Sequence, residues 1–259
     1  MDIELGLHIL AVLFVAAFVA GFIDAIAGGG GLITIPALLS VGIPPAMALG
    51  TNKLQACGGS FSASLYFIRR KAVDLKATWL LILFTFIGAS LGTIFVQLID
   101  VNALKTLLPF FVLIIGIYFL FSPTIGEEDR RQRISYPLFA FTAAAGIGFY
   151  DGMFGPATGS FLTLAFVLFL GFNLSKGVAH AKVLNFTSNF ASLIFFILGG
   201  AVLWKIGFVM MVGQFIGGNL GARMVVTKGK QIIRPLIVTM SFIMVAKMLW
   251  DQGYFSFLG

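Results

Sequence analysis

The chain has 259 residues, of which 59% are hydrophobic and only 10% are charged. An average soluble domain carries about 25% charged residues, so this composition excludes a water-soluble monomer and a disordered chain. A single cysteine also excludes a disulfide-stabilised secreted domain. The net charge of +7 comes from basic clusters between apolar runs, which is typical of cytoplasmic loops rather than of a nucleic-acid-binding face. The sequence therefore predicts a protein that crosses the lipid bilayer several times and has no nucleic-acid partner.

Apolar runs of a length suited to membrane-crossing helices recur along the whole chain. In chain order they are Leu5–Ile23, Ala46–Ile68, Ala77–Leu98, Leu104–Phe121, Tyr136–Phe149, Gly177–Leu198, Ile206–Val226 and Leu236–Trp250. Two shorter runs, Leu32–Val41 and Phe161–Phe172, reach only about 15–18 Å at 1.5 Å per residue, so we expect half-helices or re-entrant pieces there. The first run follows the acids Asp2 and Glu4 rather than a basic segment. We therefore expect it to be retained, not cleaved as a signal peptide.

The two halves of the chain repeat one another. Gly21-Phe22-Ile23-Asp24 returns 127 residues later as Gly148-Phe149-Tyr150-Asp151, and after a two-residue insertion the offset becomes 129. At the second offset the matches are Lys53 with Lys182, Ala72-Val73 with Ala201-Val202, Lys76 with Lys205, Gly88 with Gly217 and Gly92 with Gly221. A collinear set that includes an aspartate, a lysine and paired glycines indicates an internal duplication.

The loop charges indicate that the two halves are inverted. Loop 69–76 carries four basic side chains, whereas its counterpart 198–205 carries only Lys205. Loop 98–105 has one acid and one base, whereas its counterpart 222–234 has four bases and no acid. Because basic loops stay in the cytoplasm, we expect equivalent loops on opposite sides of the membrane, as in the inverted repeats of secondary transporters.

The predicted fold class is therefore an all-α polytopic membrane protein with about ten transmembrane elements in two five-element inverted repeats. Residues 1–122 form the first repeat, residues 123–134 a cytoplasmic linker and residues 135–259 the second repeat. The short run Phe161–Phe172 must count as a crossing, because otherwise loop 198–205 would not lie outside. Both termini are then expected outside.

A glycine-rich break precedes the short run in each half, spanning Asp24–Gly31 in the first and Asp151–Ser160 in the second. Unwound backbone at membrane depth persists only where it is buried in protein or lines a cavity, and the free N–H groups of the following half-helix suit an anion. We therefore expect substrate binding at Gly29, Gly30, Gly31, Thr158 and Ser160. The alternative is close helix packing by small residues, which is the interpretation we favour for Gly88, Gly92, Gly217 and Gly221.

Polar side chains also occupy matching positions in two long apolar runs. They are Thr51, Asn52, Lys53 and Gln55 in the first half and His180, Lys182, Asn185 and Asn189 in the second. A charge within a bilayer-crossing helix costs a few kcal/mol or more, so it normally faces a partner or a water-filled path. We expect Lys53 and Lys182 to converge on one substrate site together with Asn52, Gln55 and Asn185. The alternative is that both lysines lie near helix ends and extend to the headgroups.

Asp24 and Asp151 form a second symmetric pair. Each could pair with a lysine, accept from a helix N-terminus, or carry a coupling proton. His180 is a third candidate for proton coupling, because histidine titrates near neutrality; the alternative is a hydrogen-bonded structural histidine. No catalytic residue set, metal-ligand spacing or cofactor motif is present, so we expect neither an enzyme nor a resident cofactor.

These motifs resemble the TauE/SafE sulfite exporter family, also called the 4-toluene sulfonate uptake permease family. The resemblance rests on Gly21-Phe22-Ile23-Asp24 followed by four glycines at 28–31, on Pro36, on Gly50-Thr51-Asn52-Lys53, and on His180-x-Lys182-Val183-Leu184-Asn185. It implies a multi-pass secondary transporter of the bacterial inner membrane for small sulfur-containing anions such as sulfite or sulfoacetate. It also suggests Thr51, Asn52, Lys53, His180 and Lys182 as site residues. The second half departs from the motif, with Pro156, Ala157 and Thr158 in place of Gly29–Gly31.

Three functions are compatible with the sequence. The first is alternating-access transport of a small anionic substrate; the second is a passive channel for anions or small solutes; the third is a non-transporting membrane scaffold. The paired intramembrane lysines favour transport, since a scaffold has no use for them. The sequence is also compatible with a homo-oligomer.

Overall fold

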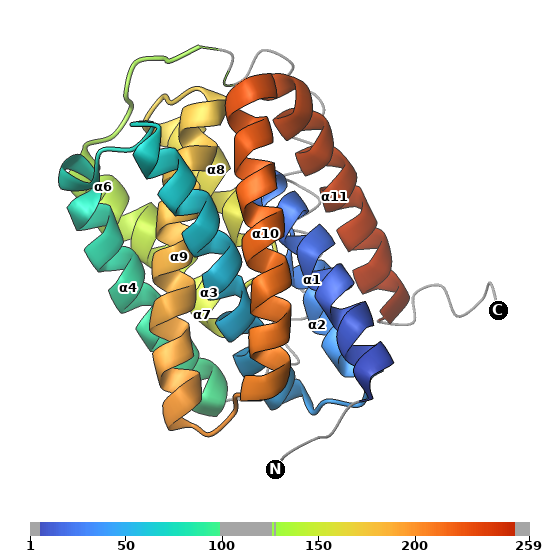
Figure 1. Ribbon diagram of the computed structural model, residues 1–259. Helices are drawn as coiled ribbons and strands as arrows, with labels where there is room; N and C mark the ends of the chain where they lie inside the picture. The colour runs from blue at the N-terminus through green and yellow to red at the C-terminus, as the bar shows by residue number, and fades with distance from the viewer. Residues whose placement is uncertain (1–5, 99–125, 127, 252–259) are drawn as a thin grey trace.

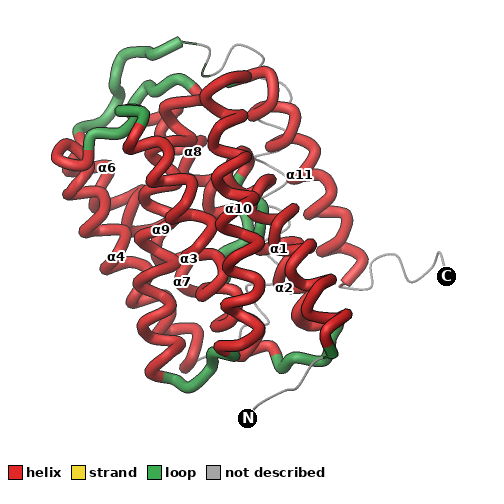
Figure 2. The backbone as a smooth tube through the Cα atoms, in the orientation of Figure 1, coloured by secondary structure: helices red, strands yellow, loops and turns green. Residues whose placement is uncertain are grey.

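The computed structural model describes residues 6–98, 126 and 128–251, and this part of the chain is helical with short connections (Figures 1 and 2). The elements are α1 (Leu7–Ala27), α2 (Gly31–Ser40), α3 (Pro45–Arg69), α4 (Leu75–Leu98), α6 (Tyr136–Phe139), the π-helical turn η1 (Ala140–Ala144), α7 (Ala145–Met153), α8 (Thr158–Phe169), α9 (Leu174–Leu198), α10 (Trp204–Lys228) and α11 (Lys230–Asp251). The predicted run Leu104–Phe121 lies outside the described residues.

Four of the described helices, α1, α4, α9 and α10, are long and apolar enough to cross a membrane, and α2 and α8 are shorter apolar helices. Helix α3 has 25 residues but is less apolar, because it carries the polar run that begins at Thr51. Large apolar side chains such as Val12, Trp79 and Leu91 point outward with more than half of their surface exposed. An all-helical, multi-pass membrane protein is therefore confirmed.

The glycine-rich breaks begin later than the sequence predicts. Helix α1 continues past Ile23 through Ala27, so Asp24 lies in its last turn. It ends where Gly28 adopts a φ of +76°, which a glycine adopts without steric cost. In the second half α7 likewise continues past Phe149 to Met153 and contains Asp151. The predicted start of the last helix was also wrong, since α11 begins at Lys230 rather than at Leu236.

The connections sort to two ends of the helical bundle (Figure 1). Residues 70–74, the segment 128–135 and the α10–α11 junction at Gly229 lie at one end, the upper end in the view. Residues 41–44 and 199–203 lie at the other, where Ile43 and Leu203 share a hydrophobic cluster. The upper end carries the basic side chains of loop 69–76, of the linker and of residues 223–234. By the positive-inside rule we expect that end to face the cytoplasm.

Small residues let the long helices pack backbone to backbone. A Cβ atom at Gly217 or Gly221 on α10 would overlap the carbonyl oxygen of Phe18 or Phe22 on α1. A Cβ at Gly88 or Gly92 on α4 would overlap the carbonyl oxygen of Ala145 or Phe149 on α7. The packing interpretation of these four glycines is therefore confirmed.

Candidate functional site

Two buried ion pairs connect the halves of the chain. The ammonium of Lys53 on α3 lies 2.9 Å from Oδ1 of Asp151 on α7. The ammonium of Lys182 on α9 lies 2.8 Å from Oδ2 of Asp24 on α1. Each lysine therefore pairs with the aspartate of the other half. Both lysine side chains are only 2% exposed, so neither extends to the headgroups, and that alternative is wrong.

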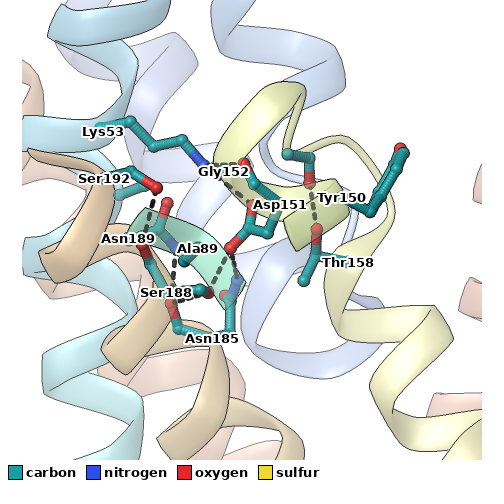
Figure 3. A network of polar contacts seen from close by, with 12 residues as sticks. Lys53, Ala89, Tyr150, Asp151, Gly152, Thr158, Asn185, Ser188, Asn189 and Ser192 are labelled. Atoms are coloured by element: carbon teal, nitrogen blue, oxygen red, sulfur yellow. Dashed lines mark hydrogen bonds and ion pairs between the residues drawn. The ribbon is translucent and has the colours of Figure 1, made fainter. Parts of the chain in front are cut away.

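The Lys53–Asp151 pair is enclosed by further polar groups (Figure 3). Besides the carboxylate, the Lys53 ammonium donates to the backbone carbonyl of Asp151 at 2.5 Å. The second oxygen of the Asp151 carboxylate accepts from the Ser188 hydroxyl and, at 3.4 Å, from Nδ2 of Asn185. Asp151 is 1% exposed, so this pair is fully withdrawn from solvent.

The Lys182–Asp24 pair is more open and caps a half-helix. Oδ1 of Asp24 accepts from the backbone N–H of Gly30 at 3.2 Å, just before α2 begins. The carboxylate thereby occupies the anion-binding position that a helix N-terminus offers. The Asp24 side chain is 18% exposed. Of the two aspartates in the ion pairs, Asp24 is therefore the one whose carboxylate is partly accessible.

The two breaks touch at the backbone. A Cβ atom on Gly28 would overlap Cα of Gly159 and the backbone nitrogen of Ser160, which are in the first turn of α8. The Ser160 hydroxyl donates to the carbonyl of Ala27, the last residue of α1. A Cβ on Gly159 would lie 3.1 Å from the Lys182 ammonium, and one on Gly155 would lie 3.2 Å from the Lys53 ammonium. The crossing of the breaks therefore lies between the two ion pairs.

Amide and hydroxyl groups of α2 and α3 form a third cluster. Oδ1 of Asn52 accepts from the Thr34 hydroxyl at 2.6 Å and from Nε2 of Gln55 at 2.6 Å. Oε1 of Gln55 is buried and has no hydrogen-bond partner among the described residues. A buried acceptor without a partner costs about 1–3 kcal/mol, so it is suited to a polar ligand or a water molecule. Gly31 lies beside this cluster, since a Cβ there would be 3.8 Å from Nδ2 of Asn52.

Several residues of the predicted site lie elsewhere or have a different partner. The Thr51 hydroxyl accepts from the backbone N–H of Leu203 at the opposite end of the bundle from the basic loops. His180 is bonded through Nδ1 to the carbonyl of Lys176 at 2.9 Å and packs against Phe166 and Phe172. The Thr158 hydroxyl donates to Gly155 within its own loop, and Gly29 faces Met240. None of these four residues joins either ion pair in the contacts of the described residues.

Two residues that contribute hydrogen bonds to the site were not predicted from the sequence. Ser188 follows Asn185 by three positions on α9, so the two share one helical face, and this spacing was a usable signal. Thr34 lies in a half-helix for which no partner could be assigned, and nothing in the sequence indicates its bond to Asn52.

The charges of the site are balanced. Two lysines face two aspartates, and the described residues place no other charged side chain in contact with these four. Among the described residues no group of three His, Cys, Asp or Glu side chains could hold a metal ion. Any further ligand of either lysine would therefore have to compete with a carboxylate.

Comparison with known proteins identifies the family of the chain. Residues 13–248 match the sulfite exporter TauE/SafE family. The chain belongs to this family. It is 61% identical over 254 residues to a probable membrane transporter protein of Haemophilus influenzae, covering 98% of this chain and all of the relative. It is 56% identical to the probable membrane transporter protein YfcA of Escherichia coli K12, covering 94% of this chain and 91% of the relative.

A more distant relative is the probable membrane transporter protein ORF9 of a Sinorhizobium species, which is 48% identical over 97% of this chain and 96% of its own length. No solved structure matches the chain. The protein is thus a multi-pass integral membrane protein and a membrane transporter of the TauE/SafE family.

Proposed function

We propose that this TauE/SafE protein is a secondary transporter of small sulfur-containing oxyanions, such as sulfite or sulfoacetate, that works by alternating access. The observation that carries the proposal is the pair of reciprocal lysine–aspartate contacts, Lys53 with Asp151 and Lys182 with Asp24. Charges buried in a membrane protein mark substrate and ion pathways. Here they lie at the meeting point of two half-helices, where secondary transporters bind their substrates.

The contacts support two five-element inverted repeats, residues 1–122 and 135–259, joined by a linker. The contact of Gly217 with the carbonyl of Phe18 has its counterpart in the contact of Gly88 with the carbonyl of Ala145. Helix α1 packs along α10 as α7 packs along α4, and α3 packs against α10 as α9 packs against α4. Helices of each half therefore pack against helices of the other half. A rocking motion between the two halves would expose the shared site to one side of the membrane at a time.

The balanced charges suggest how an anion would enter. An anion placed beside an intact lysine–aspartate pair adds a net negative charge to a buried site, which is costly. A proton on the aspartate removes that charge and frees the lysine. Asp24 is the better candidate for this step, because it is partly exposed whereas Asp151 is not. The proposal is therefore proton-coupled anion transport, with Lys182 as the anion ligand.

The substrate class comes from the family description and not from the geometry. The family is described by sulfite export, and the relatives carry the words "probable membrane transporter" without a substrate. A tetrahedral or pyramidal oxyanion would use the lysine ammonium together with the N–H groups that begin α2 and α8. The neutral donors Asn52, Gln55, Asn185 and Ser160 would complete the set, and Gly30 and Gly31 supply the backbone.

Uptake into proteoliposomes tests the proposal. Sulfite, sulfoacetate, sulfate, taurine and a small carboxylate would be supplied in turn, with the wild-type protein, Lys182→Gln and Lys176→Gln. Lys176 is the matched control, because it lies on the same helix but forms its ion pair at the surface with Asp129. We expect saturable flux of the sulfur oxyanions, at least about tenfold loss in Lys182→Gln, and near wild-type flux in Lys176→Gln.

Other outcomes would overturn this proposal. Flux that does not saturate, accompanied by single-channel conductance steps, would indicate the passive channel instead. Equal flux in wild type and Lys182→Gln would show that Lys182 is not a ligand of the transported anion. Saturable flux of the carboxylate alone would retain the transporter but reject the substrate class.

A further inference from the structure

A basic pocket and an apolar groove lie end to end between α3 and α10, apart from the two ion pairs. The two helices run side by side, facing the viewer in Figure 1. The pocket, of about 390 Å³, lies at the end that carries the basic loops. The groove, of about 500 Å³, continues toward the opposite end, where α9 forms its other wall. Phe215 lines both, so they form one continuous surface feature.

The pocket holds three arginines that have no acidic partner in the described part of the chain. Arg69, Arg70 and Arg223 line it, and all three are exposed. None forms an ion pair with a carboxylate of the described residues, whereas Lys53, Lys176 and Lys182 each have one. The Arg70 guanidinium lies over the ring of Tyr66, 5.5 Å from its centroid, which leaves its N–H edge free for a further ligand. Among the described residues, the pocket therefore carries positive charge that no carboxylate pairs with.

A buried hydroxyl at the base of the pocket also lacks a partner. Ser62 lines the pocket, is 1% exposed, and its Oγ makes no hydrogen bond to any described residue. Asn219 supplies an amide in the same pocket. A buried hydroxyl is normally hydrogen-bonded. Three arginines, a free hydroxyl and an amide together match the oxygens of a phosphate group, which guanidinium groups bind in pairs of hydrogen bonds.

The groove has the opposite character. Its lining is apolar throughout and includes Leu54, Phe61, Phe190, Met211 and Val212. Phe61 and Val212 are 44% and 52% exposed, so the groove opens onto the surface of the helical bundle that faces lipid. An apolar groove in a membrane protein is by itself an ordinary lipid contact. Its direct continuation into the arginine pocket distinguishes this one.

We infer that this surface is a binding site for an anionic phospholipid of the cytoplasmic leaflet. The phosphate binds Arg70, Arg223 and the Ser62 hydroxyl, and one acyl chain lies in the groove beside Val212. The pocket and the groove follow one another as the parts of a bilayer lipid do, with the headgroup at the basic end and the acyl chain directed toward the middle of the membrane. Basic pockets between transmembrane helices on the cytoplasmic side are suited to such headgroups.

Native mass spectrometry of the purified, detergent-solubilised protein tests the site. The probes are dioleoyl phosphatidylglycerol, dioleoyl phosphatidylcholine and glycerol 3-phosphate, the last of which shares the phosphate but has no acyl chain. The variants are Arg70→Gln/Arg223→Gln, the charge-matched control Arg131→Gln/Lys228→Gln at the same end of the bundle, and Val212→Trp, which fills the groove. All of these side chains are exposed, so the variants should fold.

We expect phosphatidylglycerol to bind at least about tenfold more tightly than phosphatidylcholine, and the double arginine variant to lose most of this difference. The control should change the affinity by less than about twofold, and Val212→Trp should weaken lipid binding several-fold. An equal loss in the control would reduce the effect to general surface charge and overturn the proposal. If glycerol 3-phosphate binds as tightly as the lipid, the ligand is a soluble anion and the proposal is overturned. If lipid binding is unchanged in Val212→Trp, the acyl chain does not lie in the groove, and this result also overturns the proposal.

Discussion

Lys182 and Asp24 are bonded across the two halves of the protein at 2.8 Å, with the lysine side chain 2% exposed and the aspartate 18% exposed. The corresponding pair, Lys53 and Asp151, has no such opening. Two contacts that are equivalent in the sequence repeat therefore differ in access. In an alternating-access transporter this difference is expected, because only one side of the site is open at a time.

Asp24→Asn should uncouple transport from protons. The amide has the shape of a protonated carboxyl group, so Lys182 is left free for an anion without a proton. Sulfoacetate is the suitable probe, because its carboxylate and sulfonate both stay ionised from about pH 6 to about pH 8. We expect an inward proton gradient to accelerate sulfoacetate uptake by the wild type and to have little effect on uptake by Asp24→Asn, measured in proteoliposomes.

Asp74→Asn provides the control for this measurement. Asp74 is an exposed acid beside the basic loop and takes no part in either ion pair. It should leave the response to the proton gradient intact. A response in Asp24→Asn as large as that of the wild type would exclude Asp24 as the coupling group.

The buried Lys53–Asp151 pair should show strong coupling in a double-mutant cycle. Removing one partner leaves an unpaired charge in the protein interior, so Lys53→Met or Asp151→Asn should each lower the free energy of unfolding by about 3–5 kcal/mol. The double variant Lys53→Met/Asp151→Asn leaves no charge and should cost clearly less than the sum. Reversible unfolding in mixed detergent micelles measures all three. Additive effects would mean that the pair does not contribute as a unit.

The sequence predicts the four charged residues of the site but not their pairing. The repeat identifies Asp24 with Asp151 and Lys53 with Lys182, and the cost of a charge in the membrane indicates that each needs a partner. Whether a lysine pairs within its own half or across depends on how α1, α3, α7 and α9 cross. That geometry is set by long-range packing, which no local pattern reveals.

Helical geometry explains why Thr51 and His180 lie outside the site. Successive residues of an α-helix are separated by about 100° around its axis, so residues two positions apart point about 160° away from each other. Thr51 therefore cannot face the same site as Lys53, and His180 cannot face the same site as Lys182. A cluster of neighbouring polar residues in the sequence therefore predicts more site residues than one face of a helix can supply. Selection by a spacing of three or four would have kept Lys182, Asn185 and Ser188 and removed His180.

Gly28 should tolerate substitution much less well than Gly42, although both have positive φ angles, +76° and +82°. An alanine in this left-handed region costs about 1–2 kcal/mol at either site. Nothing lies within 4 Å of a Cβ on Gly42, whereas a Cβ on Gly28 would overlap Gly159 and Ser160. We therefore expect Gly42→Ala to fold and transport nearly normally, and Gly28→Ala to lose both stability and flux. Melting temperature and proteoliposome flux together check this, and equal behaviour of the two variants would show that the breaks do not need their close contact.

Asp129 in the linker should stabilise the start of α9 at neutral pH and lose that effect in acid. Partial burial raises the pKa of its carboxyl, but hydrogen bonds from the backbone N–H of Asn173 at 2.7 Å and from Lys176 at 3.2 Å outweigh this and hold the pKa below its usual value of 3.8. A lowered pKa in the folded state means that the ionised carboxylate favours folding above about pH 4, and that this contribution disappears as the pH falls through the lowered pKa.

Asp129→Asn should therefore increase hydrogen exchange in the peptide that covers residues 171–177 at neutral pH. The effect should be small, about 0.2–1 kcal/mol, because the ion pair with Lys176 is about half exposed and screened by solvent. Glu128→Gln is the matched control, since Glu128 is also exposed and forms no ion pair with a described residue. As the pH is lowered toward about 3, the difference between wild type and Asp129→Asn should shrink, because the wild-type carboxyl becomes protonated as well. A difference that grows in acid would have the opposite sign and would mean that Asp129 is destabilising when ionised.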